Sequence, residues 1–126
     1  GDLDNDGDLD IVISNNNGAA NLLIRSGKPN LNWIGFELVG VKSNRDAIGT
    51  KVSIETSGMN QTKYVNNAGS YLAANDKRLL FGLGDQPTIE TITIQWPGGG
   101  LRSYSNLQSN RYYRIVEGAE ISEQPY

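Results

Sequence analysis

The sequence contains neither cysteine nor histidine. These two absences exclude disulfide bonds, thiol nucleophiles and zinc sites built on thiolate or imidazole ligands, and they remove the commonest general base near neutral pH. Because so much enzyme chemistry is excluded with them, we expect a protein that is not an enzyme. The lack of cysteine does not identify a compartment, since a secreted domain with a good hydrophobic core needs no disulfide.

Long hydrophobic runs and clusters of basic residues are also missing. No stretch approaches the roughly 18 consecutive apolar residues of a membrane span, and no segment resembles a signal peptide. The basic residues are scattered singly, so the footprint of a nucleic-acid-binding protein is absent. We therefore expect no nucleic acid partner and no membrane insertion. The sequence begins at Gly1, inside an acidic motif, and we interpret it as a fragment of a longer chain.

The negative charge is concentrated at the N-terminus. The 126 residues carry a formal net charge of −3, of which five alternating aspartates between positions 2 and 10 contribute −5, so the remainder carries about +2. Turn-forming residues at 27–32 predict a linker. We accordingly divide the chain into an acidic N-terminal segment at 1–29, a strand-rich domain at 30–118 and a polar tail at 119–126.

Short segments of alternating polarity predict an all-β fold. Ile48, Val52 and Ile54 share one parity, and a second alternating segment ends at Trp96, which is predicted to face the core. Further strands are predicted at 33–41, 61–66, 78–83, 101–104 and 111–116. The run Pro97 to Gly100 is predicted to close a hairpin, because proline lacks the ladder donor and consecutive glycines disfavour a strand. This spacing predicts a small antiparallel sandwich or barrel.

The opening segment GDLDNDGDLDIVIS has the spacing of a calcium loop. Its carboxylates occupy alternate positions with Gly7 after the third, as in the D-x-[DN]-x-[DN]-G half of such a loop. Oxygen-only ligands at flexible spacing favour calcium over zinc or magnesium. The predicted metal ligands are the side chains of Asp2, Asp4 and Asp6, the backbone carbonyl of Asp8, and Asp10 as the last acid.

Ile13 stands where a helix-loop-helix calcium site carries its bidentate glutamate, so that variant is excluded. Residues 11–13 are instead predicted to form a strand that leaves the loop, which gives a calcium-loop β-hairpin. The alternative is a solvated acidic turn that binds nothing. Carboxylates about 4 Å apart repel by about 1 kcal/mol in water and by several times more at a partly dehydrated surface, which favours a bound cation.

These motifs resemble those of two families. DLDNDGDLDIVISN followed by NLLIRS resembles the end of an FG-GAP or VCBS-type repeat, the calcium-looped unit of integrin-like β-propellers. NRDAIGTKVSI, GSYLAANDKRLLFGLG and IETITIQWPGGG resemble the ASPIC and UnbV domain, which is also found at the C-terminus of cartilage acidic protein. The resemblance implies a secreted, periplasmic or cell-surface protein in which an upstream β-propeller precedes a small β domain, and it implies no catalytic residues.

The leading functional hypothesis is a non-catalytic structural and interaction module whose partners are the upstream propeller and a protein or glycan. Candidate surface residues are Arg45, Asp46, Tyr71, Asn75 and Asp76, each of which has an alternative reading as a turn-forming, solvated or core residue. A carbohydrate-binding module could use Trp33, Trp96 or tyrosines for stacking, and since Tyr112 and Tyr113 have opposite parity we expect one of them to face outward.

A carbohydrate-active enzyme is the less favoured alternative. It would need a pair of carboxylates separated by about 5 to 9 Å across a cleft. The candidate carboxylates are Asp46, Glu55, Asp76, Asp85 and Glu90.

Overall fold

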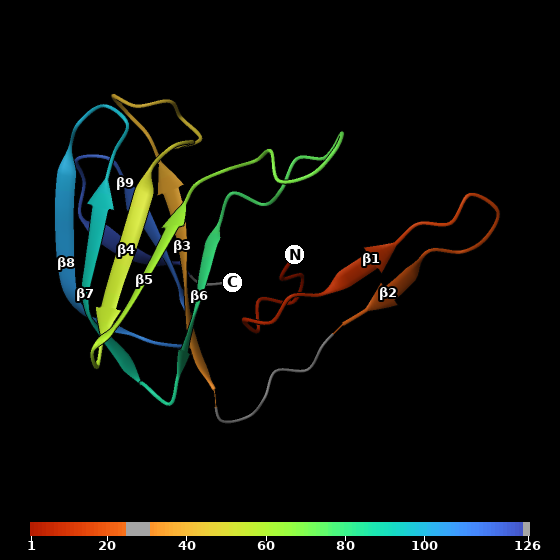
Figure 1. Cartoon of the computed structure of the whole chain (residues 1–126), viewed down its shortest axis with the longest axis horizontal. Coiled ribbons are helices and arrows are strands. Elements are labelled where there is room, and N and C mark those ends of the chain that lie inside the picture. Colours follow the sequence, from red (N-terminus) through yellow and green to blue (C-terminus); the bar gives the residue numbers. More distant parts are fainter. Residues whose placement is uncertain (25–30, 125–126) are drawn as a thin grey trace.

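The computed structural model describes residues 1–24 and 31–124, and within these residues the chain forms strands and turns but no helix. The first sheet has the order β10–β9–β3–β6, with β10 at Ile121–Gln124, β9 at Tyr112–Val116, β3 at Asn32–Val39 and β6 at Leu79–Gly84. The second sheet has the order β5–β4–β7–β8, with β5 at Met59–Tyr64, β4 at Lys51–Thr56, β7 at Thr88–Gln95 and β8 at Leu101–Gln108. A separate hairpin pairs β1, at Ile11–Ile13, with β2, at Asn21–Leu23 (Figure 1).

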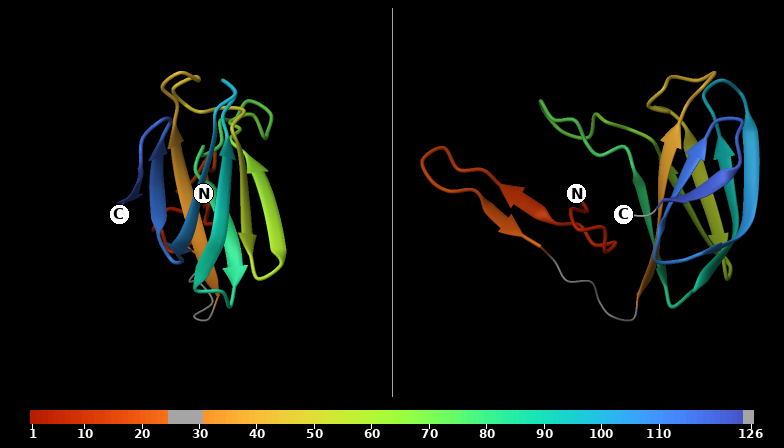
Figure 2. Two further views of the ribbon diagram at one scale, coloured as in Figure 1. Left: turned by 90° about the vertical axis from the view of Figure 1, so that its left-hand side faces the viewer. Right: turned by 180° about the vertical axis from the view of Figure 1, so that it is seen from behind.

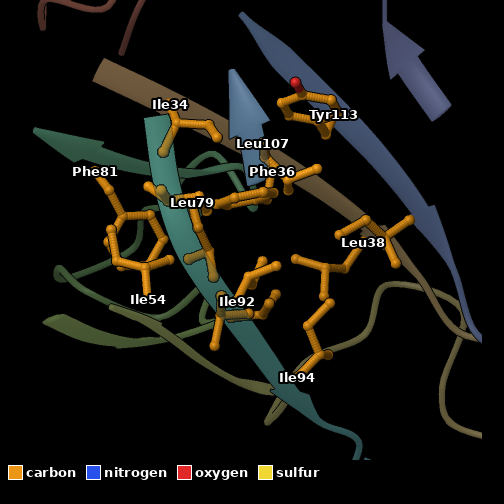
Figure 3. Close-up of a cluster of buried hydrophobic side chains, with 14 of the residues drawn as sticks. Ile34, Phe36, Leu38, Ile54, Leu79, Phe81, Ile92, Ile94, Leu107 and Tyr113 are labelled. Carbon is orange, nitrogen blue, oxygen red and sulfur yellow. The ribbon is translucent and has the colours of Figure 1, made fainter. Parts of the chain in front are cut away.

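The two four-stranded sheets face each other and enclose the hydrophobic core (Figure 2). Alternate residues of β3, among them Ile34 and Phe36, meet side chains of the second sheet such as Ile54 and Ile92 (Figure 3). Trp96 is 3% exposed and belongs to this core, as its parity predicted. The all-β sandwich is therefore confirmed, and the alternative of a closed barrel is not formed.

The predicted hairpin at the glycine run is also confirmed. β7 and β8 pair antiparallel on either side of it. The Trp96 N–H donates to the Gly100 carbonyl at 2.8 Å, and the Gly99 N–H donates to the Trp96 carbonyl at 2.9 Å. Gly99 has a φ of 88°, a left-handed conformation that glycine adopts without strain.

The first sheet departs from a purely antiparallel arrangement. β3 and β9 run parallel, with Gly35 opposite Tyr112. The chain reaches β9 by crossing from β8 in the second sheet, and a crossover, unlike a hairpin, does not force antiparallel pairing. The predicted tail contributes β10, which pairs with β9 because the turn around Gly118 folds the chain back. Within the predicted linker, residues 27–30 lie outside the described residues. Nothing in the described part of the chain is a helix long and apolar enough to cross a membrane.

Glu117, which directly follows β9, fixes the loop that follows β3. Its Oε2 accepts hydrogen bonds from the backbone N–H groups of Val41, Lys42 and Ser43 at 2.7–2.8 Å. Its Oε1 accepts one from the Ser43 hydroxyl at 3.0 Å. The backbone bond from Ser43 is the largest influence, and together these bonds lower the pKa of the Glu117 carboxyl despite some desolvation. The ionised carboxylate therefore fixes this connection.

We predict that Glu117→Gln lowers the melting temperature at pH 7, because the amide replaces one strong acceptor oxygen by a donor. Since the folded-state pKa is depressed, the stabilisation is present above the ordinary glutamate pKa of about 4.3 and is lost as the pH falls through the lowered folded-state pKa. In thermal melts from pH 7 to pH 3, the difference in melting temperature between wild type and Glu117→Gln should become smaller toward pH 3. Glu120→Gln, an exposed neighbour, is the control, and equal melting temperatures of wild type and Glu117→Gln at pH 7 would contradict the prediction.

Candidate metal centre

Three of the predicted metal ligands converge in the N-terminal loop. Asp2, Asp4 and Asp10 each present a carboxylate oxygen, and these oxygens lie within 4.8 Å of one another. Asp2 is 5% exposed and Asp10 is 4% exposed, whereas Asp4 is open to solvent. Two nearly buried carboxylates therefore lie beside a third that is exposed.

Backbone hydrogen bonds within the loop bring the carboxylates together. The Asp10 N–H donates to the Gly1 carbonyl at 2.7 Å, which joins the two ends of the loop. The Leu3 N–H donates to Asp10 Oδ2 at 2.8 Å. The N–H groups of Asp6 and Gly7 donate to the two oxygens of Asp2 at 3.2 and 3.1 Å. The alternation of aspartates thus allows side chains to cap backbone groups of the same loop.

The surroundings of Asp4 disfavour its ionised form. Desolvation, followed by the charges of Asp6 and Asp10, raises the pKa of the Asp4 carboxyl above its ordinary value. Like charges at this spacing repel, and burial of Asp2 and Asp10 reduces the screening by water. A cation with oxygen ligands would relieve both effects, so the chemistry of this donor set fits calcium.

Asp6 and Asp8 lie outside the converging group. Asp6 Oδ1 accepts a hydrogen bond from the Asp8 N–H at 2.9 Å, so this carboxylate shapes the turn. Asp8 Oδ2 is buried and has no hydrogen-bond partner among the residues that the structure describes. The structure does not test the metal-ligand assignment of any of the five aspartates, which stays a prediction.

Tyr112 of β9 contacts the acidic loop directly, and the sequence did not indicate this. Its hydroxyl donates to Asp2 Oδ2 at 2.7 Å across a separation of 110 residues. Burial, followed by the hydrogen bond to Asp2, raises the pKa of the Tyr112 hydroxyl. Tyr112 therefore remains a proton donor to the Asp2 carboxylate at any physiological pH.

Arg78, which immediately precedes β6, makes the second contact. Its guanidinium donates from Nη1 to Asn5 Oδ1 at 2.7 Å and from Nη2 to the Asp2 carbonyl at 3.0 Å. The same group lies over the Tyr112 ring, 4.9 Å from the centroid, and its Nε donates to Asp76 Oδ2 at 2.7 Å. Desolvation raises the pKa of Asp76, but the hydrogen bonds from Arg78 outweigh it and lower that pKa overall.

Trp33 of β3 makes the third contact, against the glycine at the apex of the loop. Gly7 has a φ of 90°, and a Cβ added there would overlap the Trp33 ring. The Trp33 ring also packs against Tyr112, with 5.1 Å between centroids. The glycine that the calcium-loop motif requires for its turn is thus also required for this packing.

The other residues predicted to lie on the surface or to stack on a ligand differ in their exposure. Tyr112 and Tyr113 occupy opposite faces as their parity predicted, but neither is solvent-exposed, because the acidic loop covers Tyr112 while Tyr113 joins the core. Tyr71 is 90% exposed, which favours its reading as a surface residue. Asp46 pairs with Lys77 at 2.8 Å, and Arg45 is exposed.

Comparison with known proteins assigns the strand-rich part of the chain. The family model described as ASPIC and UnbV matches residues 40–122, more than half of the chain. The match includes Arg78 and Tyr112 but not the acidic loop or Trp33. None of the curated proteins compared with the chain is similar enough to count as a relative. The resemblance of the N-terminal segment to FG-GAP or VCBS-type repeats stays a prediction.

We predict that Gly7→Ala detaches the loop apex from Trp33, since the added methyl meets the ring and the left-handed backbone disfavours alanine. The expected destabilisation is about 1–3 kcal/mol. Tryptophan fluorescence should report it, because Trp33 would gain water contact and its emission would shift to the red while the buried Trp96 stays unchanged. Gly18→Ala, at a position whose added Cβ only touches Asn15 at 4.0 Å, is the control. An unshifted spectrum for Gly7→Ala would show that this packing is not formed.

Proposed function

Because the chain belongs to the ASPIC and UnbV family, we propose that it is a non-catalytic structural and interaction module at the C-terminus of a larger protein, held in shape by calcium. The observation that carries the proposal is the convergence of Asp2, Asp4 and Asp10, two of them nearly buried. Buried carboxylates without a compensating charge are strongly destabilising, and calcium is the divalent cation that takes many oxygen ligands at flexible distances.

In this proposal the loop supplies a half-formed coordination sphere. Asp2, Asp4 and Asp10 provide charged oxygens, and the Asp8 carbonyl and Asp6 would complete the sphere as the loop closes on the ion. Calcium accepts six to eight oxygens, so water would fill the positions that the chain leaves open. An affinity in the range of extracellular calcium modules, with Kd of about 10⁻⁴–10⁻³ M, would agree with the proposed secreted, periplasmic or cell-surface location.

The β1–β2 hairpin supports the proposed propeller partner. Its large apolar side chains remain 44–59% exposed; they are Ile11, Val12, Ile13, Leu22, Leu23 and, directly after β2, Ile24. An isolated two-stranded hairpin is marginally stable in water, and its free edges are open to pairing with another strand. We propose that an upstream β-propeller covers this hairpin, with the calcium loop at the junction between hairpin and β domain.

The carbohydrate-based alternatives receive less support from the described residues. Trp96 belongs to the core, and the half-buried Trp33 already packs against Gly7 and Tyr112. Asp46 and Asp76 line one pocket of about 490 Å³, but each is ion-paired. The lowered pKa of Asp76 also disfavours it as a general acid, which needs a raised pKa. We therefore retain the interaction module as the proposed function.

We predict that the 126-residue chain binds one calcium ion with a Kd at or below about 1 mM, and magnesium more weakly, because magnesium demands stricter octahedral geometry. Titration calorimetry on protein stripped with a chelator would measure both ions. Asp10→Asn should abolish or strongly weaken the calcium heat, since it removes a charge from the centre of the cluster. Asp85→Asn, an acid of the β domain outside the loop, is the matched control. A folded wild-type sample that gives no heat at millimolar calcium would refute the proposed site.

A further inference from the structure

We propose that Tyr112 and Arg78 are positioning residues for the cation loop, and that cation binding and docking of the loop on the β domain therefore form one linked equilibrium. The inference rests on the proposed calcium function and adds to it a route by which the ion acts on the β domain. It is carried by the hydrogen bonds that join residues 1–10 to the first sheet.

Asp2 is the residue that the two events share. A carboxylate has about four lone-pair positions. Three are used by donors at Asp6, Gly7 and Tyr112, two of these on Oδ2 and one on Oδ1. Among the described residues these donors fix the orientation of the Asp2 carboxylate and leave it capacity for one more ligand bond, within 4.8 Å of oxygens of Asp4 and Asp10. The Tyr112 hydroxyl orients a predicted metal ligand from behind, as hydrogen-bonding partners of metal ligands do in established sites.

Arg78 fixes the backbone of the same loop. Its fork binds the Asp2 carbonyl and the Asn5 side chain, and Asn5 has a left-handed φ of 60°. Asp76 and the Tyr112 ring hold the guanidinium itself in place. A planar fork with this many bonds cannot be replaced by the single ammonium of a lysine. Arg78 thereby stabilises the loop in the conformation that brings the three carboxylates together.

The docking surface exists only when the first sheet is folded. Trp33 lies in β3, Tyr112 lies in β9, and Arg78 immediately precedes β6. β3 lies between β9 and β6 in the sheet. Gly35 lacks a Cβ that would overlap the Tyr112 ring, so the ring can lie flat on the outer face of the sheet. The three strands, which come from distant parts of the chain, must therefore be paired before the acidic loop can dock on the sheet.

Linkage follows from this arrangement. If docking of the loop favours the cation-binding conformation, the cation must favour docking by the same factor. A linker at 27–32 would by itself predict that calcium orders the N-terminal hairpin with little effect on the β domain. The contacts of Tyr112, Arg78 and Trp33 with the loop lead to the different expectation that calcium stabilises the β domain as well.

The test compares Tyr112→Phe with Tyr113→Phe in the full chain, using calcium calorimetry well below the melting temperature. Tyr113 is the matched control because its hydroxyl bonds only the Gln108 backbone among the described residues. Tyr112→Phe should weaken calcium binding about tenfold or more, the usual effect of removing a partner of a metal ligand, and should reduce the calcium-induced rise in melting temperature. Tyr113→Phe should leave the calcium affinity unchanged. Arg78→Lys should weaken calcium binding in the same way as Tyr112→Phe. It provides the test if Tyr112→Phe does not fold.

A double-mutant cycle of Asp2→Ala and Tyr112→Phe in excess chelator separates the two proposals. A measurable coupling energy in thermal unfolding would establish the docking contact without any ion. If wild type binds calcium but both Tyr112→Phe and Arg78→Lys bind it equally well, the inference is overturned while the calcium function stands. If wild type shows no calcium heat, the calcium function and its linkage both fail, and the cycle then decides only whether the loop is docked.

Discussion

Mutual repulsion of carboxylates within 4.8 Å is the constraint on which the N-terminal segment depends. Asp2 and Asp10 are buried despite it, because backbone N–H groups, the Tyr112 hydroxyl and the neighbouring Arg78 surround them with positive partial and full charge. The repulsion is reduced but not removed, since the charges of Asp6 and Asp10 still add to desolvation in raising the pKa of the Asp4 carboxyl. If the loop binds a cation as proposed, folding has already met part of the energetic penalty of bringing these charges together.

The first sheet, on which the acidic loop docks, carries aromatic side chains on its outer face. Parallel pairing of β3 with β9 places Tyr112 opposite Gly35, and Trp33 stands two residues before Gly35 in β3. Small size at Gly35 and at Gly7 allows sheet, ring and loop to approach closely. The Arg78 guanidinium lies over the same ring, so one aromatic side chain both hydrogen-bonds Asp2 and positions the guanidinium.

The N-terminal segment therefore has two ends of different character. Its acidic loop is docked on the β domain, while the hairpin that follows projects from it (Figure 1) and leaves apolar side chains in solvent. This combination suits a junction between two parts of a larger protein. The hydrogen-bonded acidic loop fixes the geometry, and the apolar hairpin offers surface that a neighbouring part can bury. In the proposed function, calcium would set the rigidity of this junction.

The sequence by itself determined the sandwich core, the turn at Pro97 to Gly100 and the acidic loop, because each depends on periodicity or turn chemistry over a few neighbouring residues. Val52, Ile54 and Trp96 are buried where their parity placed them. Only the tertiary structure decided what covers the outer face of the first sheet. Parity assigns Tyr112 to a face, but the partner on that face, Asp2, is 110 residues away, and no local pattern encodes which strands become neighbours or in which direction they pair. The same reason explains why the contacts of Arg78 with the acidic loop were not predicted, since they form only after β3, β6 and β9 have assembled into one sheet.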